Sequence, residues 1–459
     1  MSLRYTLGQI ARIVTGTLSG DAALTIESVV TDSREQRDNS LFIALRGERF
    51  DGHDFATLAV TNGARAVLVH KQIDGLMCPY ILVQDTEQAL RDLGTAKRKA
   101  FRGMTAGITG SSGKTTTRRL LHGILSKGQK TLQPIKNFNN HIGVPLTLME
   151  LDDSYGAAVI ELGCSDFGEI ADLTDIADPD VGLVTNVGPA HLEKLGSLDG
   201  VAEAKGELFL NMREDATAVI NIDDPRVAGM PVPQQRKIRY SAESAADVRL
   251  LRRAFIGEGG QLITLDILGA TVEIPLRLLG AHNARNALAA AAAAAAFGIG
   301  TEDICTGLSA VEPQAGRLVP CQAAMGAHII DDTYNANPAS MRAALSTLRE
   351  CAGTGRTAAV LGDMLELGAE SDAAHLEIGR FAASLKLDLL VAVGNHARAT
   401  VLGAMQGGMD PTACAFVLQT EDATASVSEM LRPGDWALIK GSRGMKMETV
   451  VGDLMKGIS

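Results

Sequence analysis

A chain of 459 residues is too long for a single hydrophobic core, and at roughly 100 to 200 residues per domain we expect three domains. A net charge of -11 with 11 Phe, 5 Tyr and 1 Trp excludes an extended basic or aromatic face for nucleic acid. The sequence has no apolar run of the about 18 residues that cross a bilayer, and no basic start followed by an apolar segment. We therefore expect a cytoplasmic protein without membrane insertion, whose six scattered cysteines stay reduced.

The first predicted unit spans residues 1 to 86 and contains strands near residues 40–45 and 79–83. Ser33 and Arg34 lie in a short polar cluster that precedes the first of these strands, and such clusters often contact ligands. Both are candidates for holding a phosphate or a uracil edge, because Arg offers a planar fork of donors. A solvated turn with a helix cap explains the same residues equally well.

The segment 109–117, Thr-Gly-Ser-Ser-Gly-Lys-Thr-Thr-Thr, predicts a phosphate-binding turn. An apolar strand pattern (104–108) precedes it, and a helical pattern (118–126) follows. Glycines allow the tight turn, the helix N-terminus favours a phosphate, Lys114 can reach the β- and γ-phosphates, and Thr115 can ligate Mg²⁺. The general P-loop pattern has a glycine where this chain has Ile108, so we interpret the turn as a shorter variant. The ATP-binding candidates here are Gly110, Ser111, Ser112, Gly113, Lys114, Thr115 and Thr116.

From residue 87 to 313 strands and helices alternate, which predicts a mostly parallel α/β sheet with strands near 157–162, 181–187 and 217–222. Glu161 ends the first of these strands, His191 lies beyond the second, and Lys205 follows. An acidic residue, a histidine and a loop hydroxyl could form a Mg²⁺ site, although a capped loop histidine is the commoner explanation of His191. A surface pairing of Lys205 with Glu207 is equally open.

Two asparagine-containing stretches belong to the same unit. Asn140 lies in the polar loop 136–145, where asparagine also favours turns for structural reasons. Asn283 and Asn286 lie in a stretch that opens an alanine-rich helix predicted over 287–297, and Asn283 could pair with an adenine edge.

The third predicted unit spans residues 314 to 459 and is a smaller doubly wound domain, with strands near 328–331, 357–361, 389–393 and 436–439. Polar loops follow three of these strands, at 331–338, 362–368 and 440–444. We expect these three loops to lie at one edge of the sheet.

These stretches together resemble the Mur ligases of bacterial cell-wall synthesis over the whole chain. The shared features are the loop TGSSGKTTT, Glu161, His191, the AKGE segment at Lys205, the HNARN stretch and the Gly316-Arg317 pair. The stretches DDTYNANPASM, LGDMLELG, KGSRGMKME, TDSR and RGERFDGHDF resemble the branch of the family that adds D-alanyl-D-alanine.

The resemblance implies an α/β chain of three domains. A small N-terminal α/β domain (1–86) would bind the UDP-sugar, and a central P-loop-type domain (87–313), with a mostly parallel sheet and helices on both faces, would bind ATP. A C-terminal Rossmann-like domain (314–459) would bind the incoming dipeptide and close on ATP. The implied activity joins D-alanyl-D-alanine to UDP-N-acetylmuramoyl-tripeptide with ATP and Mg²⁺, through an acyl phosphate. We expect a monomer.

The resemblance also implies roles for single residues. Lys114, Glu161, His191 and Lys205 would be catalytic, and Lys205 would carry a carbamate that binds a second Mg²⁺. Thr115, Glu161 and His191 would bind the metal as well. Asn283 would contact adenine with Asn286 nearby in the ATP site, and Arg317 and Asp332 would lie around the phosphates and ribose. The substrate contacts would be Ser33, Arg34, Asn140, Tyr334, Asn335 and Asn337.

One departure from the family pattern concerns the stretch that follows Glu161. Relatives commonly have a small residue and then Asn after the glycine, whereas this chain has Cys164 and Ser165. A substrate contact by that Asn is therefore not expected here. Three other functions stay open from the sequence: a ligase for a diamino acid or glutamate, a nucleotide-binding scaffold, and a P-loop kinase.

Overall fold

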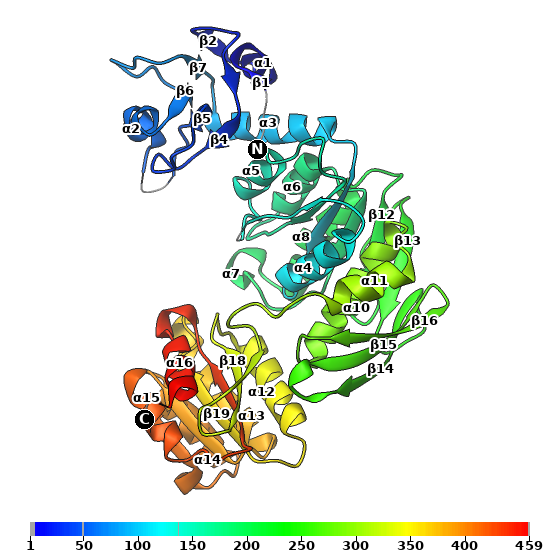
Figure 1. Cartoon of the computed structure of the whole chain (residues 1–459), viewed down its shortest axis with the longest axis vertical. Coiled ribbons are helices and arrows are strands. Elements are labelled where there is room, and N and C mark those ends of the chain that lie inside the picture. Colours follow the sequence, from blue (N-terminus) through cyan, green and yellow to red (C-terminus); the bar gives the residue numbers. More distant parts are fainter. Residues whose placement is uncertain (1–4, 48–49, 136, 458–459) are drawn as a thin grey trace. The chain divides into compact units, whose positions relative to one another are not determined.

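The computed structural model describes residues 5–47, 50–135 and 137–457 (Figure 1). Glu48, Arg49 and Lys136, from two of the polar stretches noted in the sequence, lie outside these ranges. The chain forms two compact units. The first comprises Met1–Leu250, Leu265–Val272 and Asn286–Leu308, and the second comprises Leu251–Thr264, Glu273–Arg285 and Ser309–Ser459. Within the described ranges, no helix combines the length and apolarity that a membrane crossing requires.

The N-terminal sheet of the first unit has the strand order β2-β7-β6-β5-β4. Its strands are β2 (Thr17–Ser19), β4 (Ser28–Val30), β5 (Ser40–Ile43), β6 (Ala64–Val69) and β7 (Tyr80–Leu82), and a separate antiparallel pair joins β1 (Tyr5–Thr6) to β3 (Thr25–Ile26). Strands β4 to β7 are parallel, and β2 pairs with β7 in the antiparallel sense. The predicted strands 40–45 and 79–83 are confirmed with shorter bounds.

Both faces of this N-terminal sheet are covered, as the alternation along β5 shows. Leu41 and Ile43 pack with residues of α1 (Leu7–Ile13) and α3 (Thr86–Ala100), whereas Phe42 packs with residues of α2 (Ala56–Thr61). Successive side chains of a strand point to opposite faces, so an apolar run predicts a sheet that is buried on both sides.

The central sheet has the strand order β9-β10-β8-β11-β12-β13-β14-β15-β16. Strands β8 to β13 are β8 (Met104–Thr109), β9 (Thr131–Leu132), β10 (Ala157–Glu161), β11 (Val181–Val184), β12 (Thr217–Asn221) and β13 (Arg236–Ser241), all parallel to their neighbours. The sheet continues with β14 (Val248–Phe255), β15 (Gln261–Ile267) and β16 (Ala270–Leu276). The boundaries between the two compact units cut through these three strands. The predicted strand 181–187 is too long, because the chain after Val184 turns to bond with the glycine loop.

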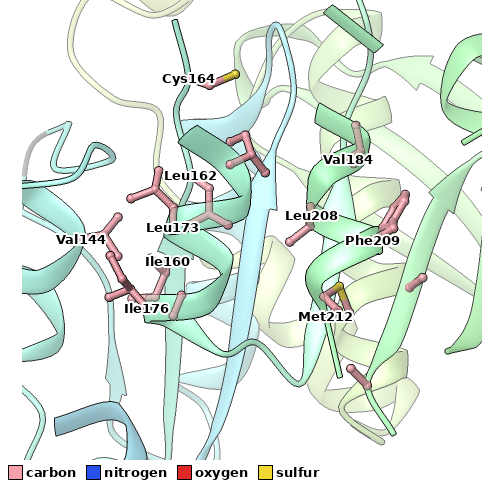
Figure 2. Packing of buried hydrophobic residues seen from close by; sticks show 14 of the residues in the cluster. Val144, Ile160, Leu162, Cys164, Leu173, Ile176, Val184, Leu208, Phe209 and Met212 are labelled. Carbon is pink, nitrogen blue, oxygen red and sulfur yellow. The ribbon is translucent and has the colours of Figure 1, made fainter. Parts of the chain in front are cut away.

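The alternation of side chains along β10 determines which way Glu161 points. Ala158 and Ile160 enter a core cluster together with residues of α5 (Gly143–Leu148), α6 (Glu169–Ala177) and α8 (Leu198–Asn211), as Figure 2 shows for Ile160. The residues in between, Val159 and Glu161, therefore face the other side of the sheet. That side carries α4 (Lys114–Leu125), the helix that follows the glycine loop.

The alanine-rich helix α10 (Ala281–Ala296) begins earlier than predicted, directly after the turn at Gly280 (φ +88°). The HNARN stretch is therefore part of the helix. The run from Ala289 to Ala294 is buried, with 2% or less of each residue exposed. Two short helices, α7 (Leu192–Leu195) and α9 (Pro225–Ala228), and α11 (Thr301–Ser309) complete this part of the chain.

The C-terminal sheet belongs to the second unit and has the order β17-β18-β22-β19-β20-β21. Its strands are β17 (Val319–Gln322), β18 (His328–Asp332), β19 (Thr357–Gly362), β20 (Leu389–Val393), β21 (Cys414–Val417) and β22 (Trp436–Lys440). Only the pairing of β17 with β18 is antiparallel. The four predicted strands are confirmed, whereas β17 and β21 were missed.

Helices cover both faces of the C-terminal sheet. Ile330 and Leu438 pack with α12 (Pro338–Ala352) and α13 (Ser371–Ser384), while the alternate residues Ile329 and Ile439 pack with α15 (Glu421–Ser428) and α16 (Glu448–Lys456). Helix α14 (Ala397–Gln406) adjoins α13. The doubly wound architecture predicted from the sequence is confirmed.

A buried arginine links three elements of the first unit. Arg98 in α3 is 6% exposed, and its Nε donates to the carbonyl oxygen of Ala177 at 2.9 Å. One terminal nitrogen donates to the carbonyl oxygen of Asp178 (2.7 Å) and to Oδ2 of Asp180 (2.9 Å). The same carboxylate oxygen accepts from the N–H of Thr105 in β8.

We expect Arg98→Ala to destabilise the first unit by about 2 kcal/mol, because it removes one of the two arginines that pair with Asp180 and leaves two carbonyl oxygens without their donor. Thermal unfolding followed by circular dichroism measures the effect. The matched control is Arg102→Ala, whose side chain is exposed and whose loss should change stability by less than about 0.5 kcal/mol. Equal melting temperatures for the two variants would contradict the structural role given to Arg98.

Candidate active site

The glycine loop between β8 and α4 lies at the carboxyl edge of the central sheet, where the strand order reverses on either side of β8. Gly110 (φ +143°) and Gly113 (φ +81°) have backbone conformations that other residues rarely adopt. A β-carbon at Gly110 would lie 1.9 Å from Oγ1 of Thr185, and one at Gly113 would lie 2.4 Å from Oδ1 of Asn286. Both positions therefore require glycine for two independent reasons.

Residues after β11 hold this loop in place. The N–H of Ser111 donates to the carbonyl oxygen of Asn186 (3.0 Å), and the N–H of Ser112 donates to Oδ1 of the same asparagine (3.0 Å). Thr185 donates its hydroxyl to the carbonyl oxygen of Ser112 at 2.6 Å. Thr185 and Asn186 were not among the predicted site residues, although their place at the end of the predicted strand 181–187 was a usable signal.

Helix α4 begins at Lys114 and has no side-chain cap at its N-terminus. Its first backbone N–H groups, which include those of Thr115 and Thr116, are the donors that an anion at a helix start accepts from. The Lys114 ammonium lies back over the loop and donates to the carbonyl oxygen of Gly110 at 2.6 Å. Burial, followed by the nearby charge of Lys205, lowers the pKa of Lys114.

Glu161 lies at the end of β10 in register with Ile108 of β8, and it is 3% exposed. Its Oε2 accepts from the hydroxyl of Thr115 (3.0 Å), and its Oε1 accepts from the side-chain amide of Asn139 (3.0 Å). The guanidinium Nε of Arg118 lies 3.5 Å from Oε2. The predicted pair Thr115 and Glu161 is thus brought together. Asn139 was missed because the asparagine loop gave no sign of which asparagine points inward.

The donor chemistry of Thr115 and Glu161 fits a magnesium ion, since a hydroxyl and a carboxylate are the hard oxygen ligands that Mg²⁺ prefers. Among the described residues, no group of three or more His, Cys, Asp or Glu side chains is arranged to hold a metal. A magnesium ion at this place would therefore need phosphate oxygens and water to complete its shell, as is usual in phosphoryl transfer.

Lys205 in α8 is 2% exposed, and its Nζ lies 3.8 Å from the Sγ of Cys164 (Figure 2 labels Cys164). Burial lowers the pKa of Lys205 and raises the pKa of the Cys164 thiol. The surface pairing of Lys205 with Glu207 is wrong. Glu207 instead accepts from the backbone N–H groups of Gly168 (2.7 Å) and Ala171 (3.0 Å) at the start of α6, and Lys205 faces the interior.

His191 precedes α7 with a left-handed backbone (φ +53°) and is largely exposed. Partial desolvation, followed by the charges of Lys205 and Lys114, lowers the pKa of His191. The histidine therefore lies close enough to both lysines to sense their charge.

Two predicted asparagines of the first unit have structural partners. Asn140 accepts from the backbone N–H groups of Ile142 (3.3 Å) and Gly143 (2.9 Å), and so stabilises the start of α5. Asn286 of α10 lies against the glycine loop, with its Oδ1 3.5 Å from the hydroxyl of Thr117. Of these two asparagines, only Asn286 lies beside the glycine loop.

In the N-terminal sheet, the segment after β4 contains both predicted contacts. Ser33 is buried, and its carbonyl oxygen accepts from the side chain of Asn62 at 2.8 Å. Arg34 has an 84% exposed side chain that pairs with Asp32 at 2.7 Å. Arg34 is thus the more accessible of the two.

The other predicted residues belong to the second unit. They are Asn283, Arg317, Asp332, Tyr334, Asn335 and Asn337. The side chain of Asn283 donates to the carbonyl oxygen of Leu279 at 2.8 Å. Asn337 accepts from the N–H of Ser340 at 2.8 Å and caps α12, which is a structural role that the sequence analysis did not separate from a substrate contact.

Lys440 at the end of β22 connects several of these residues. Its Nζ is buried and donates to Oδ2 of Asp332 (2.6 Å) and to the carbonyl oxygen of Asn335 (2.8 Å). Nearby, the Arg317 guanidinium lies over the Tyr334 ring, 4.2 Å from its centroid. Lys440 lies in the polar stretch 440–444 noted in the sequence, but it was not among the predicted site residues.

Comparisons with known proteins agree with this arrangement. Three family models match in order along the chain: "Mur ligase family, catalytic domain" at residues 25–98, "Mur ligase middle domain" at 108–294, and "Mur ligase, glutamate ligase domain" at 316–443. The UDP-N-acetylmuramoyl-tripeptide--D-alanyl-D-alanine ligase of Escherichia coli (strain K12) is 39% identical over 98% of both chains.

Solved structures give the same result. The crystal structure of MurF from Acinetobacter baumannii is 34% identical, with a TM-score of 0.89 over 99% of both chains. MurF ligase from Thermotoga maritima in complex with ADP is 28% identical, with a TM-score of 0.82 over 94% of this chain and 97% of that one. These matches span all three sheets, the glycine loop and the residues around it. The chain belongs to the Mur ligase family.

Proposed function

We propose that this chain is an ATP-dependent ligase that joins D-alanyl-D-alanine to the terminal carboxylate of UDP-N-acetylmuramoyl-tripeptide, a step of peptidoglycan precursor synthesis. The observation that carries the proposal is the 39% identity, over 98% of both chains, to the Escherichia coli enzyme of that name. The two glycines whose β-carbons would clash, and the uncapped helix start beside them, support a phosphate site in the same chain. The ADP bound to the Thermotoga maritima relative supports ATP as the phosphate donor.

The reaction has two steps. A carboxylate oxygen of the tripeptide attacks the γ-phosphorus of ATP, which forms an acyl phosphate and releases ADP. The amine of the dipeptide then attacks the acyl carbon, loses a proton, and expels inorganic phosphate as the amide forms. The protein contributes mainly positioning and charge compensation, as in other phosphoryl transfers.

The glycine loop and the start of α4 would hold the phosphates of ATP. Backbone N–H groups from Gly113 to Thr116 would donate to phosphate oxygens, while Ser111 and Ser112, whose N–H groups bond Asn186, would shape the loop around them. Lys114 would exchange its bond to the carbonyl oxygen of Gly110 for the β- and γ-phosphates. The lowered pKa of Lys114 implies an ammonium that lacks solvation and gains from a phosphate partner.

Mg²⁺ would neutralise phosphate charge during the transfer. Thr115, Glu161 and His191 would hold it, and a carbamoylated Lys205 would bind a second Mg²⁺. Carbamate formation requires a neutral amine, and the burial of Lys205 favours that form. The carbamate would replace a buried cation with an anion beside Lys114, whose charge it would balance.

The proposal also assigns a ligand to each of three regions of the chain. Residues 1–86 would bind the UDP-sugar, with Ser33 and Arg34 in contact and Asn140 nearby, and residues 87–313 would bind ATP. Residues 314–459 would bind the dipeptide. Asn283 would contact adenine, with Asn286 nearby in the ATP site. Arg317 and Asp332 would contact phosphates and ribose, and Tyr334, Asn335 and Asn337 would contact the dipeptide.

The decisive experiment measures phosphate release with ATP, Mg²⁺, UDP-N-acetylmuramoyl-tripeptide and D-alanyl-D-alanine, each omitted in turn, and identifies the product by mass. We expect release only with all four, and a product heavier by the dipeptide less one water. Release without the dipeptide, with a stable phosphorylated product, would support a kinase. ATP binding without turnover would support a scaffold, and turnover with glutamate or a diamino acid would support another ligase.

Lys114→Ala should lower kcat by at least about 100-fold, because one cation at the transferring phosphate is lost. The measurement is steady-state phosphate release, with circular dichroism to show that the variant is folded. Lys127→Ala is the matched control, since Lys127 is an exposed lysine beyond the end of the same helix. A Lys114→Ala variant with wild-type kcat would exclude the proposed phosphate contact.

Activity should fall in buffers depleted of carbon dioxide and return on addition of bicarbonate, because the carbamate on Lys205 forms reversibly from the neutral amine and CO₂. The rate of phosphate release is measured, with sodium chloride at equal ionic strength as the control for bicarbonate. A ¹³C carbamate signal that is present in the wild type and absent from Lys205→Ala provides the direct readout. Unchanged activity without carbon dioxide, together with no such signal, would rule out the modification.

A further inference from the structure

His375, on helix α13 of the second unit, fixes the loop that follows β19. The side chain is 3% exposed, its Nδ1 lies 2.6 Å from the carbonyl oxygen of Ser371, and its Nε2 lies 2.9 Å from the N–H of Met364. A carbonyl oxygen can only accept and a backbone N–H can only donate. The ring must therefore be neutral, with its proton on Nδ1 and an acceptor lone pair on Nε2.

The same loop has a second anchor one residue earlier. The Asp363 carboxylate accepts from the N–H groups of Asn395 (2.7 Å) and His396 (3.1 Å), which follow β20. Its Oδ1 lies 3.7 Å from Nε2 of His375. The His396 ring stacks on His375 with 4.8 Å between centroids, and its Nδ1 lies 2.6 Å from Asp372. The groups around His375 thus hold the start of the loop from two directions.

The loop is in turn bonded to the segment that carries the proposed dipeptide contacts. The N–H of Leu365 donates to Oγ of Ser442 at 2.9 Å, and the Ser442 hydroxyl donates to the carbonyl oxygen of Ala336 at 3.4 Å. Ala336 lies between Asn335 and Asn337 in the sequence. A continuous series of hydrogen bonds therefore runs from His375 through the loop to the residues proposed to contact the dipeptide.

The loop that follows β19 buries one side chain and exposes the next. Met364 is 1% exposed, whereas Leu365 is 44% exposed although it is a large apolar residue. A β-carbon at Gly444 would lie 2.9 Å from Cδ1 of Leu365, so the leucine lies beside the loop that follows β22. The residue whose N–H bonds His375 is thus the buried one, and its neighbour Leu365 faces outward at this edge of the sheet.

We propose that His375 is a positioning residue for the acceptor dipeptide: it holds the 363–367 loop and, through Ser442, the 334–337 segment in the conformation that binds D-alanyl-D-alanine. This inference rests on the proposed function. The bond that matters is the one that Nε2 accepts from Met364, because it reaches the loop. The bond from Nδ1 to Ser371 stays within α13 and its first turn.

Two substitutions separate these bonds. In His375→Gln the amide oxygen reaches the place of Nε2 and can still accept from Met364. In His375→Asn the shorter amide takes the place of Nδ1 and leaves Met364 without an acceptor. Both variants put an uncharged amide in the same buried position, so a purely structural role for the ring predicts similar behaviour for the two.

The experiment determines kcat and the KM for D-alanyl-D-alanine and for ATP in the full-length protein. We expect the Asn variant to raise the dipeptide KM by about tenfold, the effect of one lost hydrogen bond, with little change in the KM for ATP. The Gln variant should keep a dipeptide KM clearly below that of the Asn variant. Ser442→Ala, which breaks the next bond in the series, should raise the dipeptide KM in the same way.

Ser384→Ala is the matched control for Ser442→Ala. The Ser384 hydroxyl donates to the carbonyl oxygen of Phe381 at 2.7 Å at the end of α13, so its loss should leave the dipeptide KM unchanged. The inference is overturned if the Gln and Asn variants have equal dipeptide KM values, or if Ser442→Ala leaves that KM unchanged. Equal rises in both KM values would overturn it as well. A wild-type protein that fails the four-component assay refutes the proposed function instead.

Discussion

The close approach of backbone to side chain at two glycines is the constraint on which the candidate site depends. A β-carbon at Gly110 or Gly113 would overlap Thr185 or Asn286, so the loop can pass between β11 and α10 only as bare backbone. Because it passes there, Ser111 and Ser112 meet Asn186, α4 begins at Lys114, and Thr115 meets the carboxylate of Glu161. The position of each of these groups follows from the tight turn and from the register of β8 with β10 and β11.

Much of this arrangement could be predicted because parallel strands carry ligand groups at their carboxyl ends. The strand ending at Glu161 and the helix opening at Lys114 follow from apolar periodicity and glycine placement. The sequence could not predict which group each of these polar side chains would bond. Asn139 and Asn140 are adjacent and chemically identical, yet the first bonds Glu161 and the second accepts from backbone N–H groups at the start of α5. Lys205 and Glu207 have the spacing of a surface pair, but α8 is turned so that the lysine faces the core and the glutamate bonds the start of α6.

In the second unit, too, the elements could be predicted from the sequence but the bonding partners could not. The alternation of strands and helices along the chain predicted a doubly wound sheet, and Ile329 and Ile330 do enter clusters on opposite faces. No motif marks His375, because a single histidine in a helix gives no sign that both of its nitrogens bond backbone groups. Asn337 stands in a motif that suggests recognition, and it also caps a helix. The sequence places such residues correctly along the chain, while their partners depend on tertiary contacts.

The run of alanines in α10 raises the question of what fixes the helix in place. Alanine side chains are identical and have no rotamers, so a helix surface made of them packs almost equally well after a small rotation or a shift by one residue. Apolar packing alone therefore does not specify the register of this helix against its neighbours. Asn286 does, since it lies against Gly113 and Thr117 of another element, whereas Asn283 bonds the carbonyl oxygen of Leu279 in the turn just before the helix. In α10, stability and register thus come from different residues: the alanines supply burial, and Asn286 supplies alignment.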